Sequence, residues 1–232
     1  MNVKNKKTYY QIILDKSSSM SDCIESTVNG FNEQMQMIKR LDDKFSEQEI
    51  LVSLTTFNQD VNFDVECLEP SELKKMTSEH KNSTWFKKHK DYVVYSPQGM
   101  TALYDAIGKS VQKIHNVAKD EIEQDKATVV VVIITDGHEN SSTEFRYEQI
   151  QSMIKELEKS EKWTFSYLSN TPDAVDYAKR MNIKSENAIR YNKSEMMDVH
   201  SGLSSSLESY IERKLRGIEE RNKKKILKKK RN

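Results

Sequence analysis

Residues 127–135 read Ala-Thr-Val-Val-Val-Val-Ile-Ile-Thr and contain the longest apolar run of the 232-residue chain, Val129–Ile134. Most of these residues are β-branched, and branched side chains favour a pleated strand. A strand that is apolar on both faces must be covered on both faces, as in a parallel sheet flanked by helices. Residues 127–135 therefore predict the central strand of a mostly parallel sheet.

Shorter apolar segments predict the remaining strands of this sheet. In residues 61–66, Val61, Phe63 and Val65 alternate with polar residues. This period of two indicates a strand with one solvated face, antiparallel to its neighbour and near an edge. Further strands are expected at residues 9–14, 50–57, 163–168 and 188–191.

Apolar residues spaced three or four apart predict amphipathic helices between the strands. The segments with this spacing are residues 20–38, 103–122, 147–157, 172–181 and 203–218. A short helix is expected around Leu73 and Met76, and a local packing contact at Trp85 and Phe86. The alternation of strands and helices predicts an α/β, doubly wound (Rossmann-like) fold. Its sheet is mostly parallel with one antiparallel edge strand, and helices cover both faces.

The distribution of charge divides the chain into a body and a tail. Residues 212–232 hold 11 Lys and Arg and 3 Asp and Glu, a net charge of +8, whereas the rest carries −7. No linker or repeat interrupts residues 8–211, so we expect one domain over residues 1–211 and a basic helical extension or tail over residues 212–232. Residues 221–232 fit a solvated helix end, a nucleic-acid contact, an anionic membrane surface or an acidic protein partner.

Composition excludes several classes of protein. No apolar run reaches the length that a membrane-spanning helix needs, and no apolar segment follows the basic N-terminus as in a signal peptide. The two cysteines, Cys23 and Cys67, cannot form a disulfide framework or a zinc site by themselves. The expected compartment is therefore the cytoplasm.

Three segments place oxygen-bearing side chains directly after a predicted strand or before a predicted helix. They are residues 15–20, 99–105 and 135–137. Because ligands of such sheets bind at the carboxyl ends of the strands, these segments are expected to converge at one edge. The candidate ligands chosen from these segments are two carboxylates and three hydroxyls, an all-oxygen set that suits a hard cation such as Mg²⁺. The candidate metal ligands are Asp15, Ser17, Ser19, Thr101 and Asp136.

Simpler interpretations exist for the same residues. Asp and Ser favour helix N-caps, so residues 15–19 and Thr101 also fit capping positions. Asp105 suits the first turn of a helix because the helix dipole favours a negative charge there. His138, Glu139 and Asn140 are expected to be solvated residues of a surface loop.

The order and spacing of these residues resemble the von Willebrand factor A (VWA) domain and its metal-ion-dependent adhesion site. That site combines D-x-S-x-S, a distant Thr and a distant Asp, here Asp15, Ser17, Ser19, Thr101 and Asp136. The resemblance covers about residues 8–211. Residues 99–107 and 134–140 look most like stand-alone intracellular bacterial members. Ser18 and Met100 depart from the pattern, because glycine usually stands at both positions.

The resemblance implies a function as well as a fold. Ser17 and Ser19 would bind the metal directly, and Thr101 directly or through water. Asp15 and Asp136 would hold coordinating waters or orient the hydroxyls. The implied cofactor is Mg²⁺, with Mn²⁺ or Ca²⁺ as alternatives, and the implied partner is a protein that offers an Asp or Glu to the metal. Such members work in multi-protein bacterial systems, including stress-response clusters, and beside chaperone-like ATPases.

Three functions are compatible with the sequence. The leading hypothesis is a non-enzymatic binding adaptor. The second is a Mg²⁺-dependent phosphoester hydrolase, but Lys16 is the only basic residue in the three segments and the chain lacks the G-x-x-x-x-G-K-[ST] phosphate loop. The third is a nucleic-acid-associated protein that acts through residues 221–232.

Overall fold

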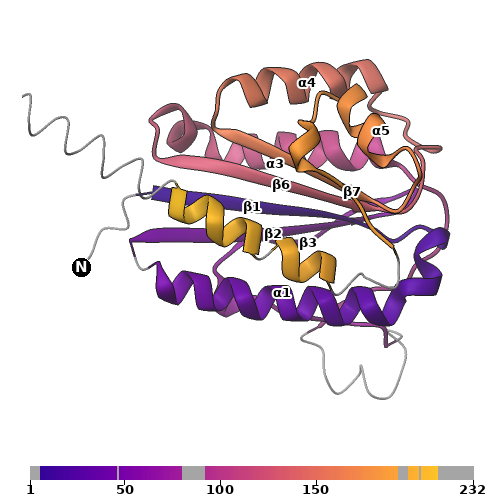
Figure 1. Cartoon of the computed structure of the whole chain (residues 1–232), viewed down its shortest axis with the longest axis horizontal. Helices are drawn as coiled ribbons and strands as arrows, with labels where there is room; N and C mark the ends of the chain where they lie inside the picture. Colours follow the sequence, from indigo (N-terminus) through magenta and orange to yellow (C-terminus); the bar gives the residue numbers. More distant parts are fainter. Residues whose placement is uncertain (1–5, 46, 80–91, 193–197, 204, 214–232) are drawn as a thin grey trace, which may run out of the picture.

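The fold is built on one six-stranded sheet, seen in a computed structural model that describes residues 6–45, 47–79, 92–192, 198–203 and 205–213. The strand order is β3-β2-β1-β6-β7-β8 (Figure 1). All neighbouring strands are parallel except β3, which runs antiparallel to β2 at one edge. The strands are β1 (Lys6–Asp15), β2 (Gln48–Phe57), β3 (Val61–Leu68), β6 (Ala127–Thr135), β7 (Trp163–Ser169) and β8 (Ala188–Arg190).

Helices cover both faces of this sheet (Figure 1). One face carries α1 (Ile24–Lys44) and the helical residues 198–203 and 205–213. The other face carries α3 (Leu103–Glu123), α4 (Tyr147–Lys159) and α5 (Ala174–Arg180). The predicted fold class, including the antiparallel edge strand, is confirmed.

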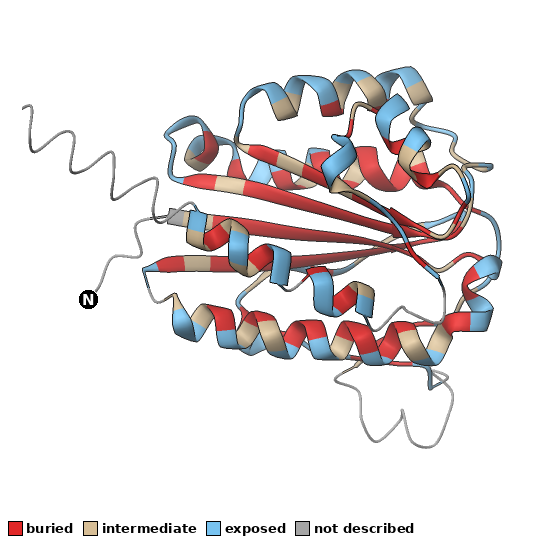
Figure 2. Cartoon of the chain, in the orientation of Figure 1, coloured by how far each residue is buried: buried red, intermediate tan, exposed pale blue. Residues whose placement is uncertain are grey.

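The central strands are buried on both sides, as their composition predicts (Figure 2). In β6, Val130, Val132 and Ile134 pack in the cluster that contains α1, and the residues between them pack against α3 and α4. The strand spans the predicted residues 127–135. A run of β-branched residues fits this position because each side chain meets an apolar layer whichever way it points.

The structure differs from the sequence-based expectation in two places. The helix expected from Met20 begins as a 3-10 turn, Ser18–Cys23, before α1. The short helix expected around Leu73 and Met76 is a 3-10 turn, Pro70–Glu72, that ends before Leu73. Met76 lies instead in a strand, β4 (Lys75–Thr77), that pairs in parallel with β5 (Tyr92–Val94).

Hydrogen bonds to a distant side chain explain why the backbone at Met76 is extended. Asn32 on α1 donates from its side-chain amide to the Met76 carbonyl (3.0 Å) and accepts from the Met76 N–H (2.7 Å). These distant partners satisfy the groups that a helix would have paired locally. The pair Trp85 and Phe86 and the extension from residue 214 onward lie outside the described residues.

The topology determines where a site forms. From β1 the chain continues into α1 on one face, and from β6 it continues toward α4 on the other. Strands β1 and β6 are neighbours, so the connections diverge between their carboxyl ends. In open α/β sheets this switch point is where ligands bind. Asp15 ends β1, and Asp136 follows β6.

A buried polar chain joins the C-terminal helical segment to the sheet. The ring Nδ1 of His200 lies 2.7 Å from the side-chain oxygen of Gln34, and the Gln34 amide donates to the Tyr10 hydroxyl at 2.9 Å. All three side chains are buried. Burial lowers the pKa of His200 to about 4, because the charged ring loses its hydration.

This shift predicts an acid-sensitive fold. The unfolded chain takes up the His200 proton below about pH 6.5 and the folded chain only below about 4, so stability is lost as the pH falls through that window. At pH 4.5 the loss attributable to His200 is about 2–3 kcal/mol. Urea unfolding at pH 7 and pH 4.5 should show that His200→Gln loses less stability than wild type by this amount. Equal losses in the two proteins would contradict the assignment.

Candidate metal centre

The first element of the site is the buried carboxylate of Asp15 at the end of β1. Its Oδ1 accepts the N–H of Ser17 at 2.6 Å, and its Oδ2 accepts the hydroxyl of Thr135 at 2.6 Å. The first bond shapes the turn that follows β1, and the second connects this turn to the end of β6. Asp15 therefore holds both loops in one arrangement.

A chain of hydroxyls connects the first and third predicted segments. The Oγ atoms of Ser17 and Ser19 lie 3.0 Å apart, and Ser19 Oγ donates to Asp136 Oδ1 at 2.5 Å. Ser17 is buried and Ser19 is exposed, so the hydroxyl chain runs from the interior to the surface of the protein. Four of the five predicted ligands thus lie within one hydrogen-bonded group.

Thr101 joins this group through the close approach of Gly137. A Cβ atom at Gly137 would lie 3.0 Å from Thr101 Oγ1 and 3.4 Å from Ser19 Oγ. Both hydroxyls therefore surround the same point of the backbone, and a larger residue at position 137 would crowd them. The structure thus brings all five predicted site residues together.

The electrostatics of the group favour a cation. Asp15 is fully buried and Asp136 is 8% exposed. Burial raises the pKa of Asp15 to about 6, hydrogen bonds from Thr135 and Ser17 oppose the rise, and the charge of Asp136 adds to it. Two neighbouring carboxylates with three hydroxyls form the hard oxygen set that Mg²⁺, Mn²⁺ or Ca²⁺ accepts, so these residues fit a divalent ion. In the described part of the chain, no three His, Cys, Asp or Glu residues are grouped to hold a metal.

Backbone hydrogen bonds tie the first loop to the second. The N–H of Lys16 donates to the Phe57 carbonyl (2.6 Å), and its carbonyl accepts the N–H of Gln98 (2.8 Å). The N–H of Ser18 donates to the Gly99 carbonyl at 3.1 Å. The segment before Thr101 is thereby fixed against the serine loop.

The third loop is attached to the beginning of α3, contrary to the expectation that Glu139 and Asn140 are merely solvated. The Asn140 side chain accepts the N–H of Thr101 at 2.8 Å, and the Asn140 N–H donates to the Thr101 carbonyl at 3.0 Å. The Glu139 carboxylate accepts the N–H of Tyr104 at 3.0 Å and those of Ser141 and Ser142 at 2.8 and 2.7 Å. These residues therefore position Thr101. His138 is exposed, as expected, and lies 3.8 Å from Asp173.

Asp105 has a structural role that the sequence did not reveal. The helix α3 begins at Leu103, so Thr101 precedes the helix and does not cap it. The buried Asp105 carboxylate accepts three backbone N–H groups, from residues 143 (2.9 Å), 144 (3.0 Å) and 145 (2.7 Å). The three donors are almost forty residues further along the chain, and no local pattern predicts them.

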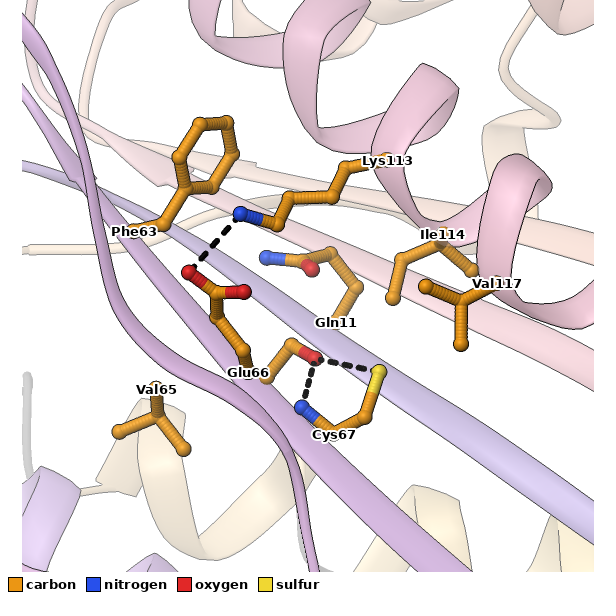
Figure 3. Close-up of a pocket in the computed structure, with 9 residues that line it drawn as sticks. Gln11, Phe63, Val65, Glu66, Cys67, Lys113, Ile114 and Val117 are labelled. Atoms are coloured by element: carbon orange, nitrogen blue, oxygen red, sulfur yellow. Dashed lines mark hydrogen bonds and ion pairs between the residues drawn. The ribbon is translucent and has the colours of Figure 1, made fainter.

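A cavity of about 120 Å³ lies between α3 and the β3 edge (Figure 3). Its polar groups contact one another: Lys113 pairs with Glu66 at 2.8 Å, and the Ser53 hydroxyl accepts the N–H of Cys67 at 2.9 Å. Figure 3 shows Lys113 and Glu66 pointing toward each other. None of the predicted ligands lines this cavity, so it is separate from the metal centre.

Comparisons with known proteins agree with this architecture. The model of the von Willebrand factor type A domain matches residues 11–202. No curated protein matches the chain in sequence.

Solved structures with the same fold come from diverse organisms. The pilus adhesin SpaC of Lactobacillus rhamnosus GG, in its open conformation, matches with a TM-score of 0.59 and 10% identity over 90% of this chain and 30% of that chain. Proximal thread matrix protein 1 of the mussel byssus gives 0.55 and 14% over 88% and 47%. A von Willebrand factor type A protein of Catenulispora acidiphila gives 0.51 and 12% over 86% and 42%. The chain spans less than half the length of each, and the likeness shows the fold alone.

Because Asp105 binds the backbone of the segment that follows Asn140, its carboxylate should contribute to the free energy of unfolding. Asp105→Ala removes the acceptor of three N–H groups and should lower the free energy of unfolding by about 2–4 kcal/mol. Asp120→Ala, an exposed carboxylate on the same helix, should change it by less than about 0.5 kcal/mol. Urea unfolding of the two variants checks the difference, and similar values for both would refute the role given to Asp105.

Proposed function

The chain belongs to the von Willebrand factor type A family, and we propose that it acts as a metal-dependent protein-binding module. Domains of this family bind a divalent metal and mediate protein interactions. In the proposal, Asp15, Ser17, Ser19, Thr101 and Asp136 hold the divalent ion. An Asp or Glu of a partner protein then completes the coordination.

One observation carries this proposal, the continuous hydroxyl and carboxylate chain from Ser17 through Ser19 to Asp136. It joins two loops at the switch point of the sheet, and Ser19 is exposed there. The three hydroxyls carry no charge, and in the proposal Asp15 and Asp136 hold coordinating waters or orient the hydroxyls, so the ligands in direct contact would leave much of the charge of the ion uncompensated. A bound cation would supply positive charge and an open coordination position, to which a partner carboxylate is attracted.

The chain's own residues favour binding over catalysis. A phosphoester hydrolase needs basic groups that stabilise charge on the transferred phosphoryl group. Lys16 is the only basic residue of the three ligand segments, and it is half-buried. We therefore propose a binding function rather than phosphoester hydrolysis.

The cellular setting is also part of the proposal. We place the protein in the bacterial cytoplasm, in a multi-protein stress-response system whose partner is a protein such as a chaperone-like ATPase. We assign the binding function to residues 1–211 and regard residues 212–232 as a basic extension or tail. Among the described residues, the structure contains no helix that is both long and apolar enough to cross a membrane.

The proposed ion should stabilise the fold. A ligand bound only by the native state adds about 2.7 kcal/mol at 100 times its Kd, which corresponds to about 5–10 °C in Tm for a domain of this size. Mg²⁺ or Mn²⁺ should raise the Tm of wild type by this amount in a thermal scan. The rise should vanish in Ser17→Ala combined with Ser19→Ala, and in Asp15→Ala combined with Asp136→Ala.

Ser18→Ala is the matched control. It removes a hydroxyl that is outside the ligand set but belongs to the same loop. It should keep the full metal-dependent rise. If the metal raises the Tm of the double variants as much as that of wild type, these five residues do not bind it.

Partner binding should depend on both the ion and Thr101. Immobilised protein with Mg²⁺ should retain a partner that EDTA releases, and Thr101→Ala should lower its recovery at least about tenfold. Four candidate ligands remain in that variant, so most of its metal-dependent stabilisation should persist. If wild type with EDTA and Thr101→Ala with Mg²⁺ both retain as much partner as wild type with Mg²⁺, the interface lies elsewhere on the domain.

A further inference from the structure

The rim of the candidate metal centre carries an unusual apolar side chain. Met100 is 54% exposed, and among the described residues only Val117 and Ile189 are large apolar residues of comparable exposure. Met100 directly precedes Thr101, the predicted ligand of the second loop. Ser18, Ser19 and Gln98, which belong to the same two loops, are polar and exposed, and with Met100 they are called the rim here. Met100 is therefore an exposed apolar side chain among polar residues of the rim.

The backbone on both sides of Met100 is held in place. Gly99 adopts a left-handed conformation with φ of +78°, and a Cβ there would lie 1.8 Å from the Gln59 side-chain oxygen. That same oxygen accepts the N–H of Met100 at 3.2 Å, and the Gly99 carbonyl accepts the N–H of Ser18 at 3.1 Å. The loop thus presents the Met100 side chain outward from a fixed backbone.

A fixed backbone with an exposed thioether is well suited to recognition. Little backbone freedom is lost when a partner binds, while the unbranched side chain adapts to the shape that it meets. Methionine sulfur also makes favourable contacts with aromatic rings. Because Met100 directly precedes Thr101, a partner that places a carboxylate at the proposed metal centre would bring its neighbouring residues close to this side chain.

We propose that Met100 is a specificity-determining contact that selects a partner whose acidic residue adjoins an aromatic or large aliphatic side chain. This inference rests on the proposed function and adds the chemistry of the partner's motif. The acidic residue supplies the ligand for the metal, and the apolar neighbour covers Met100. Burying both apolar surfaces should improve affinity on the order of tenfold.

The chain provides a matched control for this contact. Val117 is 57% exposed but lies on α3 at the mouth of the cavity in Figure 3, remote in sequence from the three ligand segments. Met100→Gln and Val117→Gln each replace an exposed apolar side chain by a polar one. Both variants should keep the Tm of wild type and its rise with Mg²⁺.

A random peptide library displayed on phage tests the proposal, because it offers the protein acidic residues in every sequence context. Immobilised protein is loaded with Mg²⁺, and bound phage are eluted with EDTA. Wild type and Val117→Gln should enrich peptides with an acidic residue beside an aromatic or large aliphatic one. Met100→Gln should enrich the acidic residue without the apolar neighbour, and should bind a wild-type-selected peptide about tenfold more weakly.

The outcomes separate the two proposals. If Met100→Gln selects the same apolar neighbour and binds the selected peptide as tightly as wild type, the inference about Met100 is wrong while the proposed function stands. If wild type yields no peptide that EDTA releases, both are overturned. If Val117→Gln loses the preference as well, the selectivity does not come from the rim.

Discussion

The carboxylates of Asp15 and Asp136 are brought together where β1 and β6 end side by side. Hydrogen bonds from the surrounding loops offset the unfavourable burial of these two neighbouring negative charges. Asp15 and Asp136 are removed from most of the solvent, and burial of neighbouring negative charges is unfavourable without compensation. Part of the compensation is visible in the hydrogen bonds from Ser17, Thr135 and Ser19. A divalent ion held by the same oxygens would complete it.

The loops around this point form one connected support. Tyr95 and Tyr191 donate their hydroxyls to the carbonyls of Asp15 and Thr135, at 2.7 and 3.3 Å, and so satisfy the last backbone acceptors of the two strands. Glu139 and Asn140 hold the third loop against the start of α3. A site supported in this way keeps its oxygens close together before any ligand arrives. Such preorganisation lowers the entropic cost of binding a metal or a partner.

The parts of the fold that depend on local patterns could be predicted from the sequence. The β-branched run at residues 127–135 and the alternation at Val61, Phe63 and Val65 predicted a buried strand and an edge strand, and both are confirmed. Contacts between distant residues could not be predicted. Met76 is extended because Asn32 binds its backbone, and Asp105 binds a loop almost forty residues away. The proximity of the five candidate ligands followed from topology, whereas the roles of Glu139 and Asn140 depend on hydrogen bonds that no spacing reveals.

The central claim is that Asp15, Ser17, Ser19, Thr101 and Asp136 hold a divalent cation. Paramagnetic relaxation by Mn²⁺ tests it most directly, in amide NMR spectra recorded while the ion is titrated into the protein. The account predicts that the resonances of residues 15–19, 101 and 136–137 broaden first, and that excess Mg²⁺ restores them. Broadening that begins at other acidic residues, or that Ser17→Ala combined with Ser19→Ala leaves unchanged, would contradict it.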